Sequence, residues 1–292
     1  MRYLKSEAMK GETILMTGAT SGIGRAAFIA LADMHPNIVI LARNETKAKD
    51  TMREVREMTG NSNLDMIACD LASLDTVRRA AAAFVASYDR LDVLANNAGI
   101  ISGKRTQTAD GFESIFAVNH LSHFVLTNLL LDKLKASVPS RVVVTSSYSQ
   151  FRGHMDFDDL MAEGSFRSWA AYGQSKLANA LFTFELARRL AGSGVTVNCF
   201  HPGAVRTNIG SGMGRAATLA YSVASRFLIS PERGAETLVY LASSPEVEGI
   251  TGKYFFEKQA TESSPESMDQ IEAQRLWEVS GRLTAKWLDP IN

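Results

Sequence analysis

The sequence predicts a single-domain α/β protein with a doubly wound parallel sheet. Short apolar, β-favouring runs alternate with amphipathic helical stretches along most of the chain. These runs are apolar throughout instead of at every second residue, which is typical of strands covered by helices on both faces. The 292 residues, 46% of them hydrophobic, can form one large core. Because no repeat, linker or charge block divides the chain, we expect residues 1–292 to form one domain.

The expected elements follow one another in a regular order. Strands are expected over 13–17, 37–42, 64–69, 91–95, 141–146 and 194–200. Helices are expected between the first two strands and over 45–58, 74–87, 110–136 and 169–191. The stretch 208–230 breaks this alternation, because it is rich in Gly, Ala and Ser and then apolar. We expect a substrate lid there, with a subunit interface or a membrane contact as alternatives.

Composition narrows the function classes. Lys+Arg and Asp+Glu are equal at 31 each, so the protein lacks the basic field of a nucleic-acid-binding protein. The N-terminus lacks the apolar stretch of a signal peptide, and no window reaches about 18 consecutive apolar residues. We therefore expect a cytoplasmic protein without a transmembrane segment.

Four residues that can bind metals are expected to have structural roles. Cys69 and Cys199 end apolar runs, so we expect both to lie in the core without forming a disulfide. His120 and His123 lie three residues apart on an expected helix with no acidic residue beside them. Ordinary packing is therefore favoured over a metal site, and we expect no bound metal.

A glycine cluster follows the first expected strand. The sequence T-G-A-T-S-G-I-G-R places Gly18, Gly22 and Gly24 between that strand and a helix. Glycines let the backbone turn tightly and approach a ligand, and a helix N-terminus offers unpaired N–H groups to a pyrophosphate. Three glycines can also form a plain turn, but the order of strand, glycines and helix indicates a dinucleotide site.

The end of the second expected strand indicates which dinucleotide binds. An acidic residue in this place binds the ribose 2′-hydroxyl of NAD. Here Arg43 stands between Ala42 and Asn44, and its guanidinium can pair with a 2′-phosphate. We therefore expect NADP(H), with a solvated arginine as the alternative. Asp70, at the end of the third strand, is expected near the adenine, or else it caps the next helix.

Several polar residues indicate acid/base chemistry. Tyr172 and Lys176 lie four apart in a helical segment and project from one face. A lysine cation lowers the pKa of a neighbouring phenol, which brings its proton transfer closer to neutral pH. Ser146 and Ser147 end a strand at the carboxyl edge, where a serine can hold a substrate oxygen or form a turn. Asn119 lies inside a helical run, so it is either exposed or holds a partner such as a water.

Together these motifs resemble the short-chain dehydrogenase/reductase family over nearly the whole chain. T-G-A-T-S-G-I-G at 17–24 resembles the family's cofactor motif, N-N-A-G at 96–99 its fourth-strand motif, and Y-G-Q-S-K at 172–176 its active site. The resemblance implies a Rossmann-type fold that binds NADP(H). It implies a catalytic tetrad of Asn119, Ser147, Tyr172 and Lys176.

The resemblance also assigns roles to these residues. It implies that Ser147 orients the carbonyl, that Tyr172 is the acid/base, and that Asn119 anchors a water relay. Lys176 would also hold the nicotinamide ribose, and Pro202 to Thr207 would contact the carboxamide. The implied cofactor-binding residues are Gly18, Thr20, Ser21, Gly22, Ile23, Gly24, Arg43, Asn44, Asp70, Leu71, Asn97, Ala98, Gly99, Tyr172, Lys176, Pro202, Gly203, Val205 and Thr207.

Within that family, five segments resemble the retinol dehydrogenase branch, which acts on retinoids and other apolar aldehydes and alcohols. They are L-A-R-N at 41–44, V-N-H-L-S-H-F at 118–124, H-P-G-A-V-R-T at 201–207, S-P-E-V-E-G-I-T-G-K-Y-F at 244–255 and R-L-W-E-V-S at 275–280. Many members of that branch carry an N-terminal membrane anchor, whereas this chain begins almost at its first strand, so we expect a soluble relative.

The expected function is NADP(H)-dependent hydride transfer between nicotinamide and a hydrophobic aldehyde, ketone or alcohol. The family resemblance implies a homodimer or homotetramer. Reduction of a C=C bond is an alternative reaction, because related chlorophyll-precursor reductases share some of these motifs. An NADP(H) sensor without turnover and a scaffold protein without cofactor are alternatives from other classes.

Overall fold

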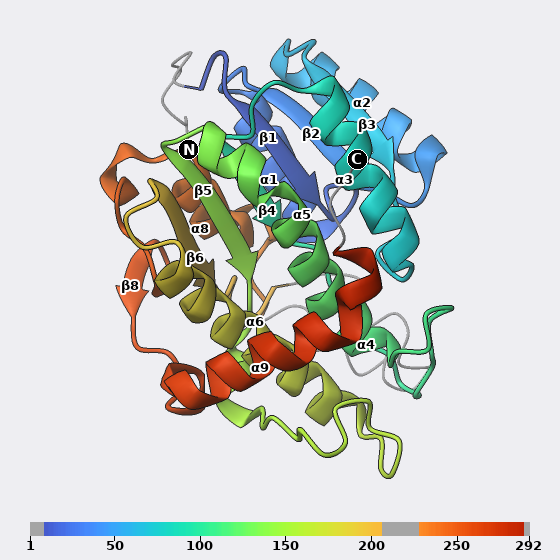
Figure 1. The fold of residues 1–292 in the computed structure, drawn as a ribbon. Coiled ribbons are helices and arrows are strands. Elements are labelled where there is room, and N and C mark those ends of the chain that lie inside the picture. Colours follow the sequence, from blue (N-terminus) through green and yellow to red (C-terminus); the bar gives the residue numbers. More distant parts are fainter. Residues whose placement is uncertain (1–8, 206–227, 289–292) are drawn as a thin grey trace.

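A single twisted sheet organises the protein (Figure 1). The computed structural model describes residues 9–205 and 228–288. The sheet has eight strands in the order β3-β2-β1-β4-β5-β6-β7-β8. Every neighbouring pair is parallel except β7 and β8, which are antiparallel. This topology confirms the predicted doubly wound α/β fold and adds an antiparallel edge strand to it.

Most strands agree with the sequence pattern. They are β1 (Thr13–Thr17), β2 (Asn37–Ala42), β3 (Leu64–Ala68), β4 (Val93–Asn96), β5 (Ser140–Thr145), β6 (Val195–Phe200), β7 (Lys253–Phe256) and β8 (Gln259–Thr261). The first six lie where strands were predicted, with ends shifted by at most two residues. β3 departs from the apolar rule, because Asp65 and Ala68 are exposed at this edge of the sheet.

The helices differ more from expectation. They are α1 (Gly22–Ala32), α2 (Glu45–Thr59), α3 (Leu74–Ser87), α4 (Ser114–Phe116), α5 (Ser122–Ala136), α6 (Ser168–Arg189), α8 (Pro231–Ser243) and α9 (Gln270–Thr284). Shorter helical segments are η1 (Ala117–Leu121), η2 (Tyr148–Arg152), η5 (Pro245–Val247), η6 (Glu266–Met268) and η7 (Ala285–Trp287). The elements after residue 230 had not been predicted.

The helix expected over 110–136 begins later and is not regular. Glu113 caps it, since its carboxylate accepts hydrogen bonds of 2.8 Å from the N–H groups of Ile115 and Phe116. The segment η1 that follows is a π-helix. Such wide turns are frequent at functional sites, and this one carries Asn119.

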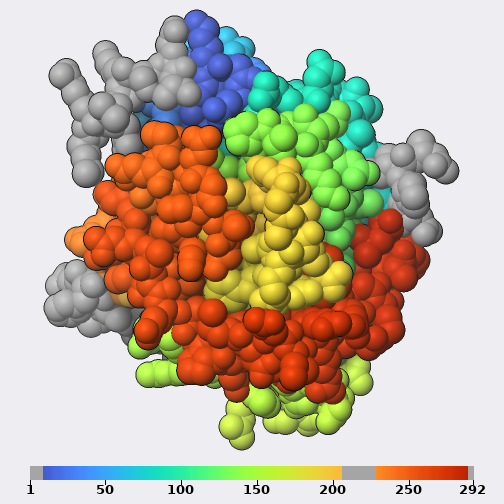
Figure 2. Space-filling view, turned by 60° about the vertical axis from the view of Figure 1, so that its left-hand side comes forward, coloured from blue at the N-terminus to red at the C-terminus, as the bar shows by residue number. Residues whose placement is uncertain are grey.

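Helices cover both faces of the sheet. Apolar residues of α1, α2 and α8 pack on one face, and those of α3, α5 and α6 pack on the other. α9 lies against α6, farther from the sheet (Figure 1). In Figure 2 the C-terminal segment, in red, forms a continuous band below the yellow surface of the α6 and β6 region. Cys69 and Cys199 are both buried, which confirms that they belong to the core.

One apolar helical segment has the properties of a membrane span. Within the described residues, only Ser114–Ala136 is long and apolar enough to cross a membrane. The rule of about 18 consecutive apolar residues did not identify it, because polar side chains such as those of Asn119 and His123 interrupt the run. Of its most apolar window, 78% is buried inside the fold, so these side chains already pack against protein.

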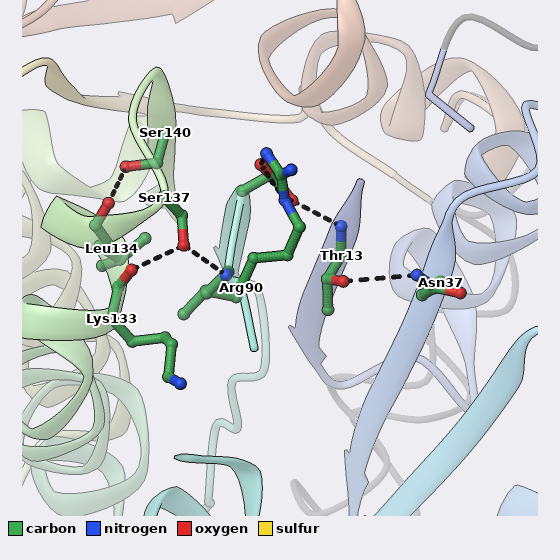
Figure 3. Close-up of polar contacts among 9 residues, drawn as sticks. Thr13, Asn37, Arg90, Lys133, Leu134, Ser137 and Ser140 are labelled. Carbon is green, nitrogen blue, oxygen red and sulfur yellow. Dashed lines mark hydrogen bonds and ion pairs between the residues drawn. The ribbon is translucent and has the colours of Figure 1, made fainter. Parts of the chain in front are cut away.

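Polar contacts close the amino edge of the sheet (Figure 3). The buried carboxylate of Asp92 accepts the N–H of Thr13 at 2.7 Å and the Nε–H of Arg90 at 2.8 Å. The Ser137 hydroxyl accepts the N–H of Leu91 at 2.9 Å and so joins the end of α5 to the start of β4. These contacts leave the opposite, carboxyl edge of the sheet for binding, as is usual in this architecture.

Candidate active site

The turn between β1 and α1 requires glycine. Gly18 and Gly22 have φ values of +72° and +52°, which favour glycine. A Cβ on Gly24 would lie 2.0 Å from the carbonyl oxygen of Gly18, so no side chain fits there. Ser21 precedes α1 in an extended conformation, and its side chain makes no capping hydrogen bond in the described structure. The N–H groups at this helix start therefore suit a pyrophosphate.

The N-N-A-G segment lies directly beside this turn. The Nδ2–H of Asn97 donates to the carbonyl oxygen of Thr17 at 3.1 Å. The N–H groups of Asn97 and Ala98 donate to the Thr17 hydroxyl at 2.9 and 3.0 Å. A Cβ on Gly99 would lie 3.2 Å from the Nζ of Lys176. The segment therefore connects the phosphate-type turn to the Tyr172–Lys176 helix.

The end of β2 carries an exposed cation. The Arg43 side chain is 77% exposed, and its nearest guanidinium nitrogen lies 4.0 Å from the Asp70 carboxylate. Asn44 caps α2 by accepting the N–H of Lys47 at 2.9 Å. The ion pair between Arg43 and Asp70 is exposed and long, so it contributes little to stability. The Arg43 side chain can therefore turn toward an added phosphate.

The alternative prediction that Asp70 caps the next helix is wrong. Its Oδ1 accepts the N–H of Ala72 at 3.1 Å, which makes a turn before the helix. The N-cap of α3 is Ser73, and the N–H of Leu74 donates to the carboxylate of Asp110 at 2.8 Å. Asp70 therefore lies at the carboxyl edge beside Arg43, and its expected place near the adenine stays a prediction.

Tyr172 lies in α6, with its side chain almost fully buried. Burial raises the pKa of its phenol to about 12, and a hydrogen bond with Ser147 lowers that pKa by less. The pKa of this phenol therefore lies above its ordinary value, whereas the sequence predicted a lowered one. The Nζ of Lys176 is 5.7 Å from the centre of the ring, and desolvation of the phenolate dominates. The phenol of Tyr172 therefore keeps its proton at neutral pH.

Lys176 is a buried cation with an unusual proton affinity. It is 2% exposed, and its Nζ donates to the carbonyl oxygen of Thr145 at 3.1 Å. Burial lowers the pKa of its ammonium to about 8. A buried lysine with a perturbed pKa beside a buried tyrosine is typical of a catalytic site.

The two serines after β5 have different roles. The hydroxyl of Ser146 donates to the carbonyl oxygen of Lys176 at 2.8 Å, so this serine fastens the strand to α6. Ser147 caps η2 by accepting the N–H of Ser149 at 3.1 Å, and it reaches Tyr172. Of the pair, only Ser147 joins the proposed acid/base group.

Asn119 is fully buried, so the alternative that it is exposed is wrong. Its Oδ1 accepts the N–H of Ile100 at 2.7 Å, and its Nδ2 donates to the Ile100 carbonyl at 3.0 Å. The same nitrogen donates to the Ser175 hydroxyl at 2.9 Å. The side chain does hold partners, as the other alternative expected, but those partners are protein groups.

The segment after β6 lies near the start of α1. Gly203 has a φ of +84°, and its N–H donates to Nδ1 of His201 at 3.1 Å. Val205 pairs with Ile229 in a short parallel bridge. Val205 and Ile23 both border Gly234 of α8. Pro202 to Val205 therefore lie near the phosphate-type turn, whereas Thr207 and residues 208–227 of the expected lid lie outside the described residues.

Two polar residues of this network were not predicted as functional. Thr17 organises the N-N-A-G segment, and the one available signal was its place directly before Gly18 in the glycine motif. His123 lies 3.1 Å from the Thr17 hydroxyl, although the sequence pattern predicted only ordinary packing for it. Across residues 9–205 and 228–288, no group of three or more His, Cys, Asp or Glu side chains is arranged to hold a metal.

Comparison with known proteins identifies the family. The short chain dehydrogenase family model matches residues 12–217. Human retinol dehydrogenase 14 is 44% identical over 93% of this chain and 86% of its own length, and human polyprenol dehydrogenase is 38% identical over 92% and 84%. Among solved structures, an uncharacterised protein from Mycobacterium paratuberculosis has a TM-score of 0.76 and 32% identity, over 96% of this chain and 97% of its own.

A second solved structure is that of a protein in complex with a nicotinamide cofactor. The Pseudomonas aeruginosa RhlG/NADP active-site complex has a TM-score of 0.69 and 26% identity, over 87% of this chain and 97% of its own. The fold, the glycine turn and the Tyr172–Lys176 pair described above agree with these matches. The chain belongs to the short-chain dehydrogenase/reductase family, and within it to the retinol dehydrogenase-like members.

Proposed function

We propose that this oxidoreductase uses NADP(H) and acts on a hydrophobic aldehyde or ketone, or on the matching alcohol. The observation that carries the proposal is the group formed by Ser147, Tyr172 and Lys176 at the carboxyl edge, next to the glycine turn. The tetrad assigned by family resemblance, which also includes Asn119, is part of this proposal.

NADP(H) is favoured over NAD(H) by the end of β2. Arg43 provides an exposed guanidinium where a carboxylate would bind the 2′-hydroxyl of NAD. A phosphate there would form charge-assisted hydrogen bonds with the guanidinium. The related RhlG structure is a complex with NADP, which is consistent with the same choice here.

The chain's own residues supply the proton and the positioning. When bound, the nicotinamide supplies a hydride at its C4 carbon. The hydroxyl groups of Ser147 and Tyr172 hold the carbonyl oxygen, and Tyr172 donates its proton to that oxygen as negative charge develops there. The ammonium of Lys176 lies close enough to stabilise the tyrosinate that remains. In the alcohol oxidation direction the tyrosinate form of Tyr172 accepts the proton of the alcohol.

Exposed aromatic side chains around these hydroxyls favour an apolar substrate. Tyr148 follows Ser147 directly, is 61% exposed and contacts the ring of Phe151. Trp169 is 62% exposed, and its ring centre lies 6.2 Å from that of Tyr172. Such surfaces suit an apolar chain or ring more than a charged metabolite. The related retinol and polyprenol dehydrogenases are named for apolar alcohols, which supports the same class.

The decisive experiment measures NADPH consumption by near-UV absorbance. The panel contains retinal, straight-chain aldehydes and aromatic ketones, with NADH in parallel and the Tyr172→Phe variant as a control. Turnover with NADPH well above NADH, abolished in the variant, is expected. NADPH binding without turnover across the panel would contradict the proposed reaction and favour C=C reduction or a sensing role. Sedimentation of the same sample tests the expected homodimer or homotetramer.

A further inference from the structure

The helical segment around Asn119 carries two buried histidines that the proposed reaction does not use. His120 and His123 are each 1% exposed. His120 packs among phenylalanine rings, and its Nε2 lies 2.9 Å from the hydroxyl of Ser280. His123 instead faces the cofactor turn, since its Nε2 lies 3.1 Å from the hydroxyl of Thr17. The two histidines therefore have different surroundings although they share one segment.

The contacts of His123 determine which ring nitrogen carries the proton. Its Nδ1 lies 3.1 Å from the backbone carbonyl oxygen of Asn119, which can only accept, so Nδ1–H is the donor. Burial, and secondarily the charge of Lys176, lowers the pKa of His123 to about 3, so the ring is neutral at working pH. Nε2 is then unprotonated and accepts the proton of the Thr17 hydroxyl.

This direction of donation leaves the Thr17 oxygen free to accept the two N–H groups of Asn97 and Ala98. The Thr17 hydroxyl has one other acceptor nearby, the Ala95 carbonyl, at a longer distance of 3.4 Å. His123 thus fixes the orientation of the hydroxyl that holds the N-N-A-G segment against β1. If the Thr17 hydroxyl rotated, its oxygen would be less well aligned with the N–H of Asn97 or that of Ala98.

At its other end, the network reaches the catalytic helix. The backbone carbonyl of Asn119 accepts the hydrogen bond from Nδ1–H of His123. The side-chain amide of Asn119 in turn donates to the Ser175 hydroxyl. The Ser175 hydroxyl then donates to the carbonyl oxygen of Tyr172 at 2.8 Å. A chain of hydrogen bonds therefore runs from the phosphate-type turn, through one imidazole, to the backbone of the proposed acid/base residue.

We propose that His123 is a positioning residue that holds the cofactor turn and the N-N-A-G segment in register with Asn119 and Tyr172. It touches neither substrate nor cofactor, and it acts through Thr17 on one side and Asn119 on the other. The inference rests on the proposed function for its kinetic consequences, whereas its hydrogen-bond directions can be measured on the protein alone.

The first test is a double-mutant cycle on NADPH affinity, measured by equilibrium fluorescence titration. Thr17→Val and His123→Leu each remove one side of the contact, and each is expected to weaken binding about tenfold. Because both act through one hydroxyl, the double variant is expected to bind within about twofold of Thr17→Val alone. The proposal is overturned if the loss of NADPH affinity in the double variant equals the product of the losses in the two single variants. His120→Leu is the matched control. In the double variant with Thr17→Val, the effects of the two substitutions on NADPH affinity are expected to be independent.

The second test separates positioning from simple filling of space. In His123→Gln the side-chain oxygen can accept from Thr17, but the donor to Asn119 is lost. We expect His123→Gln to bind NADPH more tightly than His123→Leu does, while its kcat stays low. If His123→Gln binds NADPH as weakly as His123→Leu, the proposed positioning role is contradicted. Thermal unfolding of all variants verifies that they are folded.

The third test needs no substrate. ¹⁵N NMR of histidine-labelled protein is expected to show one ring with the proton on Nδ1 and an unprotonated Nε2, unchanged between about pH 5 and 9. Its assignment follows from the signal that disappears in His123→Gln. A protonated Nε2, or titration in this range, would overturn the inference. If NADPH did not bind at all, the proposed function would fail while this measurement still decided the tautomer.

Discussion

Lys176 lies one helical turn after Tyr172, with its ammonium nitrogen 5.7 Å from the centre of the tyrosine ring. Both side chains are buried, and burial acts on them in opposite directions. It raises the pKa of Tyr172 to about 12 and lowers that of Lys176 to about 8. Near neutral pH the pair therefore consists of a neutral phenol and a cation, which is the state needed for proton donation to a carbonyl oxygen.

We expect Tyr172→Phe to lower kcat by about a hundredfold or more, because the variant lacks the proton donor. NADPH affinity should stay close to that of the wild type, since the ring and its packing remain. Steady-state kinetics together with fluorescence titration provides the check. Survival of most of the activity would mean that another group supplies the proton.

The buried ammonium should make stability depend on pH in a predictable window. Its pKa of about 8 lies below the ordinary value of 10.5, so between these pH values the unfolded chain binds more protons and stability rises with pH. Below pH 8 the wild type carries the full cost of burying the charge, about 3 kcal/mol. Lys176→Met lacks this cost.

The stability of Lys176→Met relative to the wild type should therefore be greatest below pH 8 and fall by about 3 kcal/mol as the pH approaches 10.5. Urea unfolding at a series of pH values measures this difference. Tyr172 is present in both proteins, so its contribution to the pH dependence of the unfolding free energy cancels in the comparison. A difference that did not change with pH would show that the ammonium is not destabilised by burial.

Reversing the charge at Arg43 should change which cofactor is used. Arg43→Asp is expected to raise KM for NADPH about tenfold to a hundredfold while changing KM for NADH much less, because a charge-assisted contact is replaced by repulsion. Arg53→Asp is the matched control, since it reverses the charge of another exposed arginine, which pairs with Asp50 within α2. That control should leave KM for NADPH unchanged. Equal effects of Arg43→Asp on both cofactors would refute the phosphate contact.

A methyl group on Gly24 should disrupt the cofactor turn. The added Cβ would stand 2.0 Å from the Gly18 carbonyl oxygen and 2.5 Å from Nδ2 of Asn97, so α1 must shift. Gly24→Ala is expected to lower NADPH affinity by more than about tenfold and to lower Tm as well. In contrast, Gly281→Ala in α9 meets nothing within 4 Å and should raise stability by about 0.5–1 kcal/mol. Normal NADPH affinity in Gly24→Ala would show that the turn tolerates displacement.

The alternation of apolar runs and helical stretches predicted the strands that build the site, because a parallel strand covered on both faces needs an apolar run. The apolar pattern predicted elements incorrectly where tertiary contacts or exposure, and not the local sequence, determine the structure. The helix over 110–136 has a continuous apolar pattern, yet Glu113 delays its start and a π-turn widens it at Asn119. β8 was not predicted because its residues are all exposed, so no apolar run marks it.

Local chemistry, which the sequence alone determines, includes the glycines of the cofactor turn, the spacing of Tyr172 and Lys176 on one helix face, and the arginine after β2. Each depends on backbone conformation and on neighbours a few residues away. Proton affinities and partners were decided only by the tertiary structure. Burial set the pKa values of Tyr172 and Lys176, and the fold brought His123 to Thr17 across 106 residues of chain. Desolvation and contacts between distant segments arise only when the whole chain has packed, so no local pattern records them.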